Sequence, residues 1–214
     1  MSPLTKVARL RIARRSVGLA EHRQIAAEVI PDEALIGQIA NGDKDALRIL
    51  FTRHNLRVFR FLLRIVNNQA AAEDLLNEVF LEVWRHANRF QSRSLATTWI
   101  LAIARNKALS SLRRRPFEAL DDKVDLQDPG DNPEMAMQKV SRNLMLQEAL
   151  QGLSAAHREV IDLVYYHEQS IDEVAEIIGA PQNTVKTRLF YARKQLAELM
   201  SSRGVDASCL GLAA

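Results

Sequence analysis

The chain has 214 residues, of which 29 are Lys or Arg and 26 are Asp or Glu, so its formal net charge is only +3. No window of about 20 residues is free of charge, and the basic N-terminus lacks a long apolar core, which argues against a membrane span and a secretory signal. The single cysteine, Cys209, excludes an intramolecular disulfide and a cysteine-built zinc site. We therefore expect a soluble, cytoplasmic protein without a metal or a cofactor.

Helical periodicity begins after a basic N-terminal extension, residues 1–31. Pro31 and Asp32 mark the start of a first helix. A second helix should run from the turn "NGD" to about Val66, because its apolar residues recur at intervals of three and four. A third helix follows the break "NNQAA", and a long fourth helix follows the polar loop "FQSRS". These four helices predict a first helical domain of residues 32–115.

Charge is unevenly distributed along the chain. From Arg89 to Arg115 there are seven basic residues and no acidic one. Residues 116–133 hold six acids and one lysine, a net charge of 1 − 6 = −5. This acidic stretch contains Pro and Gly and lacks apolar periodicity, so it is expected to be a flexible linker.

Residues 134–201 show helical periodicity again and predict a second, smaller helical domain, followed by a C-terminal tail, residues 202–214. No segment alternates between apolar and polar residues as a strand would. The expected fold is therefore all-α, with two small helical domains joined by a flexible acidic linker.

The second domain contains a predicted helix-turn-helix. Ser170 and Glu173 form a capping box at the start of its first helix. Gly179 suits a left-handed turn residue, and Pro181 suits the first turn of the next helix. In such a motif the second helix presents its side chains to the major groove.

The second helix is basic on the side that faces away from its apolar stripe. Arg and Lys donate to guanine, and Thr contacts a thymine methyl or a phosphate, so this side suits DNA. The alternatives are a solvated basic helix in an ordinary bundle and a helix lying on a membrane surface. The candidate DNA-binding residues are Thr184, Lys186, Thr187, Arg188, Phe190, Tyr191, Arg193 and Lys194.

Two segments resemble a known family. "AAEDLLNEVFLEVWRHANRFQSRSLATTWILAIARNKALSSLRRR", residues 71–115, resembles region 2 of the extracytoplasmic-function (ECF), or RpoE-like, group of bacterial sigma factors. "LSAAHREVIDLVYYHEQSIDEVAEIIGAPQNTVKTRLFYARKQLAEL", residues 153–199, is similar to region 4 of the same group. The resemblance implies a dissociable subunit that binds core RNA polymerase. Its region 2 would bind and open the minus-10 promoter element, and its region 4 would read the minus-35 element.

The basic, acid-free segment agrees with that implication, because a surface that follows a phosphate backbone needs positive charge. The polar loop could hold an unstacked base, with Phe90 and Trp99 as stacking surfaces, although Trp99 could equally belong to the core. The family often has Gly and an acid where this chain has Ser92, Arg93 and Ser94, so the captured base is open. The candidate minus-10 residues are Arg89, Phe90, Gln91, Ser92, Arg93, Ser94, Thr98, Trp99, Arg105, Asn106, Lys107 and Arg113.

The helix before the polar loop carries Asp74, Glu78 and Glu82 at intervals of four, and each like-charge pair costs about 0.2–0.5 kcal/mol in an isolated helix. Something outside the helix should offset that cost. The resemblance implies that this segment docks on the clamp helices of the largest polymerase subunit, while region 4 meets the flap of the second largest. A solvated acidic face is the alternative. The candidate polymerase-binding residues are Asp74, Leu75, Asn77, Glu78, Leu81 and Trp84.

Further expectations follow from the resemblance. An anti-sigma factor should hold the protein inactive, wedged between the two domains, in a stress response. The acidic linker would thread the polymerase cleft as a nucleic-acid mimic. The basic extension could be an arm on DNA, and the terminal Leu-Ala-Ala could be a degradation signal.

Two other classes of function compete with this interpretation. The five histidines are scattered, and no nucleophile, base and oxyanion site occur together, so an enzyme and a small-molecule substrate are not expected. A stand-alone helix-turn-helix transcription regulator would use the same second domain without polymerase.

Overall fold

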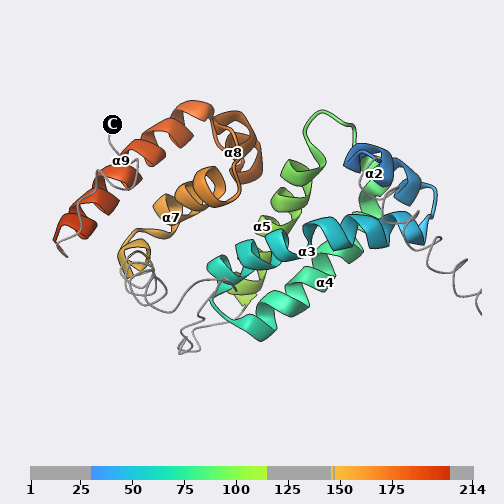
Figure 1. Ribbon diagram of the computed structural model, residues 1–214, viewed down its shortest axis with the longest axis horizontal. Coiled ribbons are helices and arrows are strands. Elements are labelled where there is room, and N and C mark those ends of the chain that lie inside the picture. The colour runs from blue at the N-terminus through green and yellow to red at the C-terminus, as the bar shows by residue number, and fades with distance from the viewer. Residues whose placement is uncertain (1–29, 115–145, 147, 203–214) are drawn as a thin grey trace, which may run out of the picture.

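The computed structural model describes residues 30–114, 146 and 148–202 (Figure 1). Within these ranges all regular structure is helical, in agreement with the predicted all-α class. The acidic linker lies outside the described residues. So do the N-terminal extension and the C-terminal tail except at their inner edges, which leaves the DNA arm and the degradation signal untested.

The first domain is a bundle in which α3, α4 and α5 pack around a common apolar core (Figure 1). Phe61, Leu62, Val79 and Ile100 are fully buried in it. The elements of this domain are α2 (Asp32–Ala40), α3 (Lys44–Val66), α4 (Gln69–His86), the 3₁₀ turn η1 (Ala87–Arg89) and α5 (Ala96–Arg114).

Short polar residues set the helix boundaries. Asp43 caps α3 by accepting hydrogen bonds from the backbone N–H groups of Asp45 and Ala46. Asn67 ends α3 in the left-handed conformation, with φ 48°, which Asn tolerates better than most residues. Asn68 then caps α4 by accepting from Ala71. The predicted break is therefore only two residues long, and α3 turns directly into α4.

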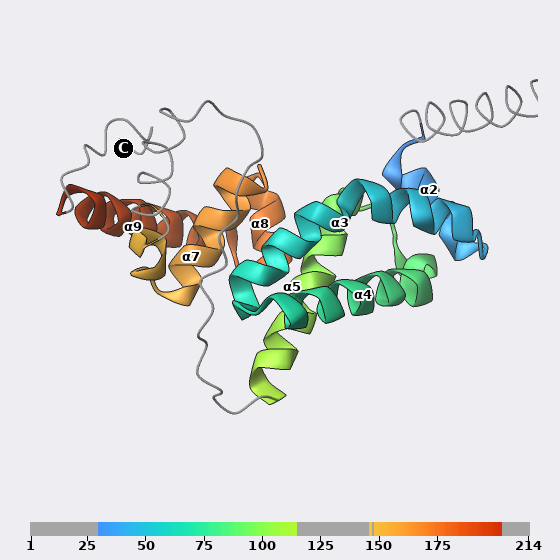
Figure 2. The same ribbon diagram turned by 60° about the horizontal axis from the view of Figure 1, so that its bottom comes forward.

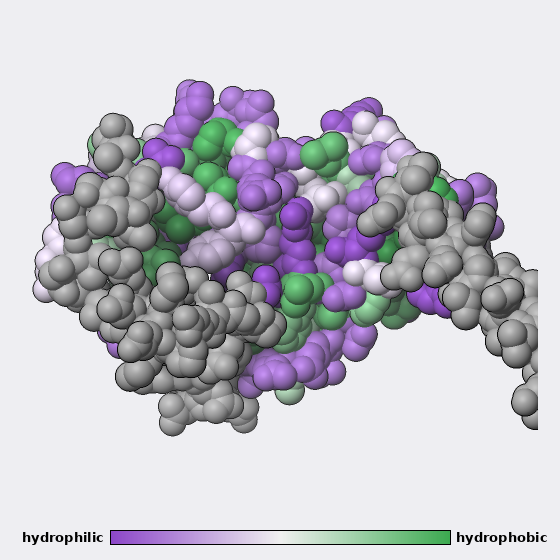
Figure 3. Space-filling view, in the orientation of Figure 1, coloured by the Kyte–Doolittle hydropathy of each residue, from purple (hydrophilic) through white to green (hydrophobic). Residues whose placement is uncertain are grey.

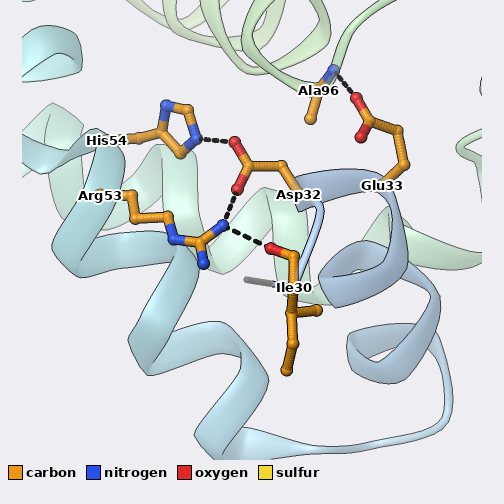
Figure 4. Close-up of polar contacts among 6 residues, drawn as sticks. All are labelled: Ile30, Asp32, Glu33, Arg53, His54 and Ala96. Carbon is orange, nitrogen blue, oxygen red and sulfur yellow. Dashed lines mark hydrogen bonds and ion pairs between the residues drawn. The ribbon is translucent and has the colours of Figure 1, made fainter. Parts of the chain in front are cut away.

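A polar network fastens α2 to α3 (Figure 4). The Asp32 carboxylate accepts from Arg53 Nη1 at 2.6 Å and lies 2.6 Å from His54 Nε2. Arg53 also donates to the carbonyl of Ile30 at 2.7 Å. The hydrogen bond with His54, and then that with Arg53, outweigh the effect of burial and lower the pKa of Asp32. The network holds an ionised carboxylate at the start of α2, where the helix dipole favours it.

The neighbouring acid, Glu33, links α2 to α5. Its Oε1 accepts a hydrogen bond from the backbone N–H of Ala96 at 3.1 Å (Figure 4). Ala96 is the first residue of α5, where backbone N–H groups lack intrahelical partners. A carboxylate from α2 therefore stabilises the start of the helix that follows the polar loop.

The second domain contains α7 (Ala155–Ile161), the π-helical turn η2 (Asp162–Tyr166), α8 (Ile171–Ile178) and α9 (Gln182–Ser201). Ser154 caps α7 by accepting from the N–H of His157, and Ser170 and Glu173 form the predicted capping box of α8. Gly179 is left-handed, with φ 65°, and separates α8 from α9 as predicted. The helix-turn-helix is thus present.

The two domains are in direct contact (Figures 1 and 2). Helix α5 lies against α8, and the C-terminal part of α3 lies against η2. Hydrophilic side chains (purple) are common where the domains meet on the face in Figure 3. Ion pairs and the ring contact of Phe61 with His167 contribute to this contact.

We predict that Asp32→Asn lowers the free energy of unfolding by about 2 kcal/mol at neutral pH, because it removes a charged acceptor shared by Arg53 and His54. The pKa of Asp32 is lowered in the folded state, so its contribution is complete above the ordinary value of 3.8 and is lost as the pH falls through the folded pKa. Urea unfolding at several pH values should show the gap between variant and wild type narrowing in acid.

The matched control is Asp45→Asn, whose ion pair with Arg48 is exposed. It should change stability by less than about 0.5 kcal/mol. Equal losses in the two variants would contradict a special role for the Asp32 network.

Candidate nucleic-acid and polymerase interface

The recognition helix α9 has the two faces that its sequence predicts. Val185, Leu189, Ala192 and Leu196 are buried and form the inward stripe. Of the candidate DNA-binding residues, Thr184, Arg188 and Arg193 are half-buried, and the exposed ones are Lys186, Thr187, Phe190, Tyr191 and Lys194. The side of α9 that faces solvent therefore presents positive charge and aromatic rings.

One side of α9 is ordered by contacts with η2. Arg193 Nε donates to the Tyr165 hydroxyl at 2.6 Å, and its guanidinium lies 5.5 Å from the centre of that ring. Phe190 and Tyr191 pack edge to face at 5.4 Å while both remain more than half exposed. An aromatic pair held in this way can stack on a base or pack on another protein.

The polar loop between η1 and α5 is positioned by an aromatic contact. The rings of Phe90 and Trp99 lie 5.1 Å apart, and both side chains are half-buried against the core. Ser92 has φ 51°, which makes the loop turn sharply. Arg89, Gln91, Ser92 and Arg93 are exposed, and Ser94 is half-buried. Trp99 thus belongs partly to the core, and the loop itself is open to a ligand.

Helix α5 does not present its candidate residues on one surface. Thr98 and Arg105 point to the second domain. Asn106 and Lys107 line a cavity of about 450 Å³ between α4 and α5. Arg113 is exposed near the end of the helix. The acid-free run is continuous in sequence, but the helix distributes it over several faces.

Lys107 offsets the like charges of α4. Its Nζ lies 3.1 Å from Glu82 Oε2 and 3.8 Å from Glu78 Oε2. The hydrogen bond from Lys107 lowers the pKa of Glu82. A lysine of the same domain therefore offsets the repulsion between the acids of α4. Those acids are not by themselves evidence for a contact with polymerase.

The candidate polymerase-binding residues divide between surface and core. Asp74, Asn77, Glu78 and Leu81 are exposed, and Leu81 keeps 47% of its surface accessible. Trp84 is half-buried against the core. Leu75 is only 5% exposed and belongs to the core, and it lines the cavity between α4 and α5. Four of the six candidates are therefore exposed on α4.

Sequence reasoning missed the residues of the second domain that meet α5. The Glu159 carboxylate accepts two hydrogen bonds from Arg105, from Nε to Oε1 at 2.6 Å and from Nη2 to Oε2 at 3.1 Å. The Thr98 hydroxyl lies 3.2 Å from both Gln169 Oε1 and Glu173 Oε1 and donates its one proton to either. Burial raises the pKa of Glu173, but hydrogen bonds from Ser170 and Thr98 outweigh it, so Glu173 stays ionised.

A second contact joins α3 to η2. Arg64 bonds to the buried carboxylate of Asp162, and its guanidinium lies 3.8 Å from the centre of the Tyr166 ring. The His167 ring packs edge to face on Phe61 at 5.3 Å. Burial, and then the nearby arginines, lower the pKa of His167 to about 4, so its ring is neutral at physiological pH.

His167 Nε2 lies 3.4 Å from Asp162 Oδ2, yet neither ring nitrogen has a hydrogen-bond partner. The other oxygen of that carboxylate is engaged by Arg64, which balances its charge. No local pattern in the sequence indicates these pairs, since Arg64 and Asp162 are 98 positions apart.

Other kinds of site are not indicated in the part of the chain that the structure describes. It contains no group of three His, Cys, Asp or Glu side chains arranged to hold a metal ion. None of its helices combines the length and the apolar character that crossing a membrane requires.

Comparison with known proteins finds a family match for each of the two domains. Residues 50–116 match Sigma-70 region 2, and residues 143–196 match Sigma-70, region 4. The RNA polymerase sigma factor CarQ of Myxococcus xanthus is 33% identical over 162 residues, which cover 75% of this chain and 92% of CarQ. The ECF RNA polymerase sigma factor SigL of Mycobacterium tuberculosis is 29% identical over 177 residues, which cover 80% of this chain and 98% of SigL.

Solved structures share the fold. CnrH, determined in complex with the cytosolic domain of CnrY, aligns with a TM-score of 0.61 at 22% identity over 80% of this chain and 97% of CnrH. The sigma factor RpoE of Bartonella quintana, determined with the anti-sigma factor NepR, aligns with a TM-score of 0.53 at 24% identity over 71% of this chain and 94% of RpoE. The chain therefore belongs to the extracytoplasmic-function group of the sigma-70 family, the sigma factors that direct RNA polymerase to specific promoters.

Proposed function

We propose that this sigma factor binds core RNA polymerase through the exposed side of α4, holds the minus-10 element at the loop before α5, and reads the minus-35 element with α9. The observation that carries the proposal is the presence of regions 2 and 4 in one chain, in this order, each with an exposed basic surface. A stand-alone regulator needs no counterpart of region 2, so this pairing disfavours that alternative. Like other sigma factors, the protein would not be an enzyme by itself.

In the first domain, the exposed polar loop is the proposed pocket for an unstacked minus-10 base. Gln91, Ser92 and Arg93 are accessible there, and Arg89 and Arg113 offer charge to phosphates on either side. The rings of Phe90 and Trp99, one on each side of the loop in sequence, contact each other at 5.1 Å. Glu33 supports the loop, because its bond to Ala96 holds the start of α5 where the loop ends.

In the second domain, Lys186 and Thr187 face solvent in the first turns of α9, where a recognition helix meets base edges. Lys194 lies farther along the helix and suits a phosphate contact. Tyr191 is more than half exposed, and its ring suits an apolar contact such as a thymine methyl.

The proposed partners are core RNA polymerase, through the clamp helices of the largest subunit and the flap of the second largest, promoter DNA and an anti-sigma factor. Such a regulator was expected to wedge between the two domains, and these contact each other where Thr98 of α5 meets Gln169 and Glu173. An anti-sigma factor would have to displace those contacts or bind elsewhere. We place the protein in the cytoplasm, where RNA polymerase works, and in a stress response.

Reconstitution tests the function directly. The purified chain, mixed with bacterial core polymerase and a library of promoter fragments from its host, should give transcripts that start at defined positions and are absent without the chain. Tight binding to duplex DNA without initiation would instead favour a stand-alone regulator.

Lys186→Ala should weaken promoter binding by the reconstituted holoenzyme about tenfold, because it removes one charged contact to the upstream element. The matched control is Lys44→Ala, an exposed lysine of the first domain. Competition binding on promoters with and without the upstream element checks the assignment. A loss that persists on the template without that element would contradict it.

Leu81→Asp should weaken binding to core polymerase by about 2 kcal/mol, because a charge replaces an exposed apolar side chain at the proposed docking surface of α4. Leu56→Asp is the matched control on α3, where the leucine is 55% exposed. Fluorescence anisotropy of the labelled protein with core polymerase measures both affinities. Similar losses in the two variants would refute a specific role for α4.

A further inference from the structure

The polar loop borders a cavity of about 430 Å³. Such a volume lies in the range of small-ligand pockets, about 300–1,000 Å³. The first domain forms one wall of the cavity with the loop and one carboxylate of α2: Glu33, Ser92, Arg93, Ser94 and Leu95. Acids of α8 form the other wall: Asp172, Glu173 and Glu176. The first-domain wall therefore offers a carboxylate, a guanidinium and two hydroxyls to one ligand.

Glu33 is half-buried, and only one of its two oxygens is engaged within the described part of the chain. Oε1 accepts the hydrogen bond from the backbone N–H of Ala96, which fixes the direction of the carboxylate (Figure 4). Oε2 has no hydrogen bond or ion pair with another described residue. A ligand in the cavity thus meets a single acceptor that is already held in place, an arrangement that favours specific recognition.

The loop supplies hydrogen-bond donors beside this acceptor. Arg93 is exposed and has no carboxylate partner among the described residues, and a guanidinium can only donate. The hydroxyls of Ser92 and Ser94 can donate or accept. The first-domain wall therefore matches a ligand edge that has one donor next to acceptors.

The edges of the four bases differ in this respect. Cytosine and adenine carry an exocyclic amino group next to a ring nitrogen that accepts, whereas thymine and guanine carry a carbonyl oxygen in place of that amino group. A carboxylate oxygen accepts from an amino group and repels a carbonyl oxygen. The two neighbouring donors of guanine would need both carboxylate oxygens for a two-point contact, and Ala96 occupies one of those of Glu33.

We propose that Glu33 is a specificity-determining residue for the minus-10 element: its Oε2 accepts a hydrogen bond from the exocyclic amino group of the unstacked base. The pocket then prefers cytosine or adenine to thymine or guanine. This inference rests on the proposed function, which assigns the polar loop to an unstacked minus-10 base. Sequence reasoning did not select Glu33, because it lies 63 positions before Ala96, on a different helix.

Glu33→Gln tests this role with little change of shape. The N–H of Ala96 needs an acceptor, so the amide oxygen of the new side chain takes the place of Oε1. Its NH₂ group then takes the place of Oε2 and donates to the base instead of accepting from it. The variant should therefore lose the preference for an amino group and favour a carbonyl oxygen.

Two control variants make the same change of charge elsewhere. Glu73→Gln alters an exposed acid of α4 in the first domain. Glu176→Gln alters the opposite wall of the cavity, which belongs to the domain assigned to the minus-35 element. Circular dichroism verifies that all three variants remain folded.

The measurement uses the reconstituted holoenzyme and the non-template strand of a promoter mapped with it. Competition binding compares the four bases at each minus-10 position. Wild type and both controls should show one position at which cytosine or adenine binds about tenfold more tightly than thymine or guanine. The stronger of the two amino bases identifies the natural ligand. Glu33→Gln should abolish or reverse the preference at that position and keep the preferences at all others.

A base analogue with hydrogen in place of the amino group isolates the proposed hydrogen bond. At the same position it should bind the wild-type holoenzyme about tenfold more weakly than the natural base, and it should cost the Glu33→Gln holoenzyme nothing.

Three results would overturn the proposal. Equal weakening of all four bases by Glu33→Gln would mean that Glu33 only supports the start of α5. A wild-type pocket that prefers thymine or guanine would exclude an acceptor at Oε2, and an equal switch in Glu176→Gln would assign the acceptor to α8. None of these results affects the proposed function, which fails only if the wild-type holoenzyme does not initiate at a defined position.

Discussion

The ion pair between Arg105 and Glu159 connects the two domains of this protein at α5. One side of α5 is fixed in the core by Ile100, Leu101 and Ala104, so its other side is presented in a single orientation. In the structure that side contacts the second domain, whose side chains accept hydrogen bonds from Thr98 and Arg105.

Charge acts differently in the folded protein than along the chain. The acid-free run from Arg89 to Arg115 looks like one nucleic-acid surface, but the structure places Lys107 beside the acids of α4 and Arg105 beside Glu159. The acids of α8, which cannot lie on phosphates, face the basic loop instead. Charge pairing within the chain thus accounts for part of a pattern that would otherwise be assigned to DNA and polymerase.

Local signals predicted the elements well because their causes are local. The capping box of Ser170 and Glu173, the left-handed Gly179 and the buried stripe of α9 each depend on residues within a few positions of one another. The resemblance to regions 2 and 4 was confirmed by comparison. The 5% exposure of Leu75 was not evident, because a helical pattern does not say which edge of its apolar face is covered by neighbouring helices.

The sequence by itself determined the helical class, the helix-turn-helix, the segmentation of charge and the family, since each depends on composition, spacing or short motifs. Only the tertiary structure decided which charges meet. Arg64 and Asp162 are 98 positions apart, and Arg105 and Glu159 are 54 apart. No periodicity relates such positions, because their proximity results from the packing of one domain on the other. The π-helical turn that contains Asp162 likewise was not among the elements predicted from the sequence.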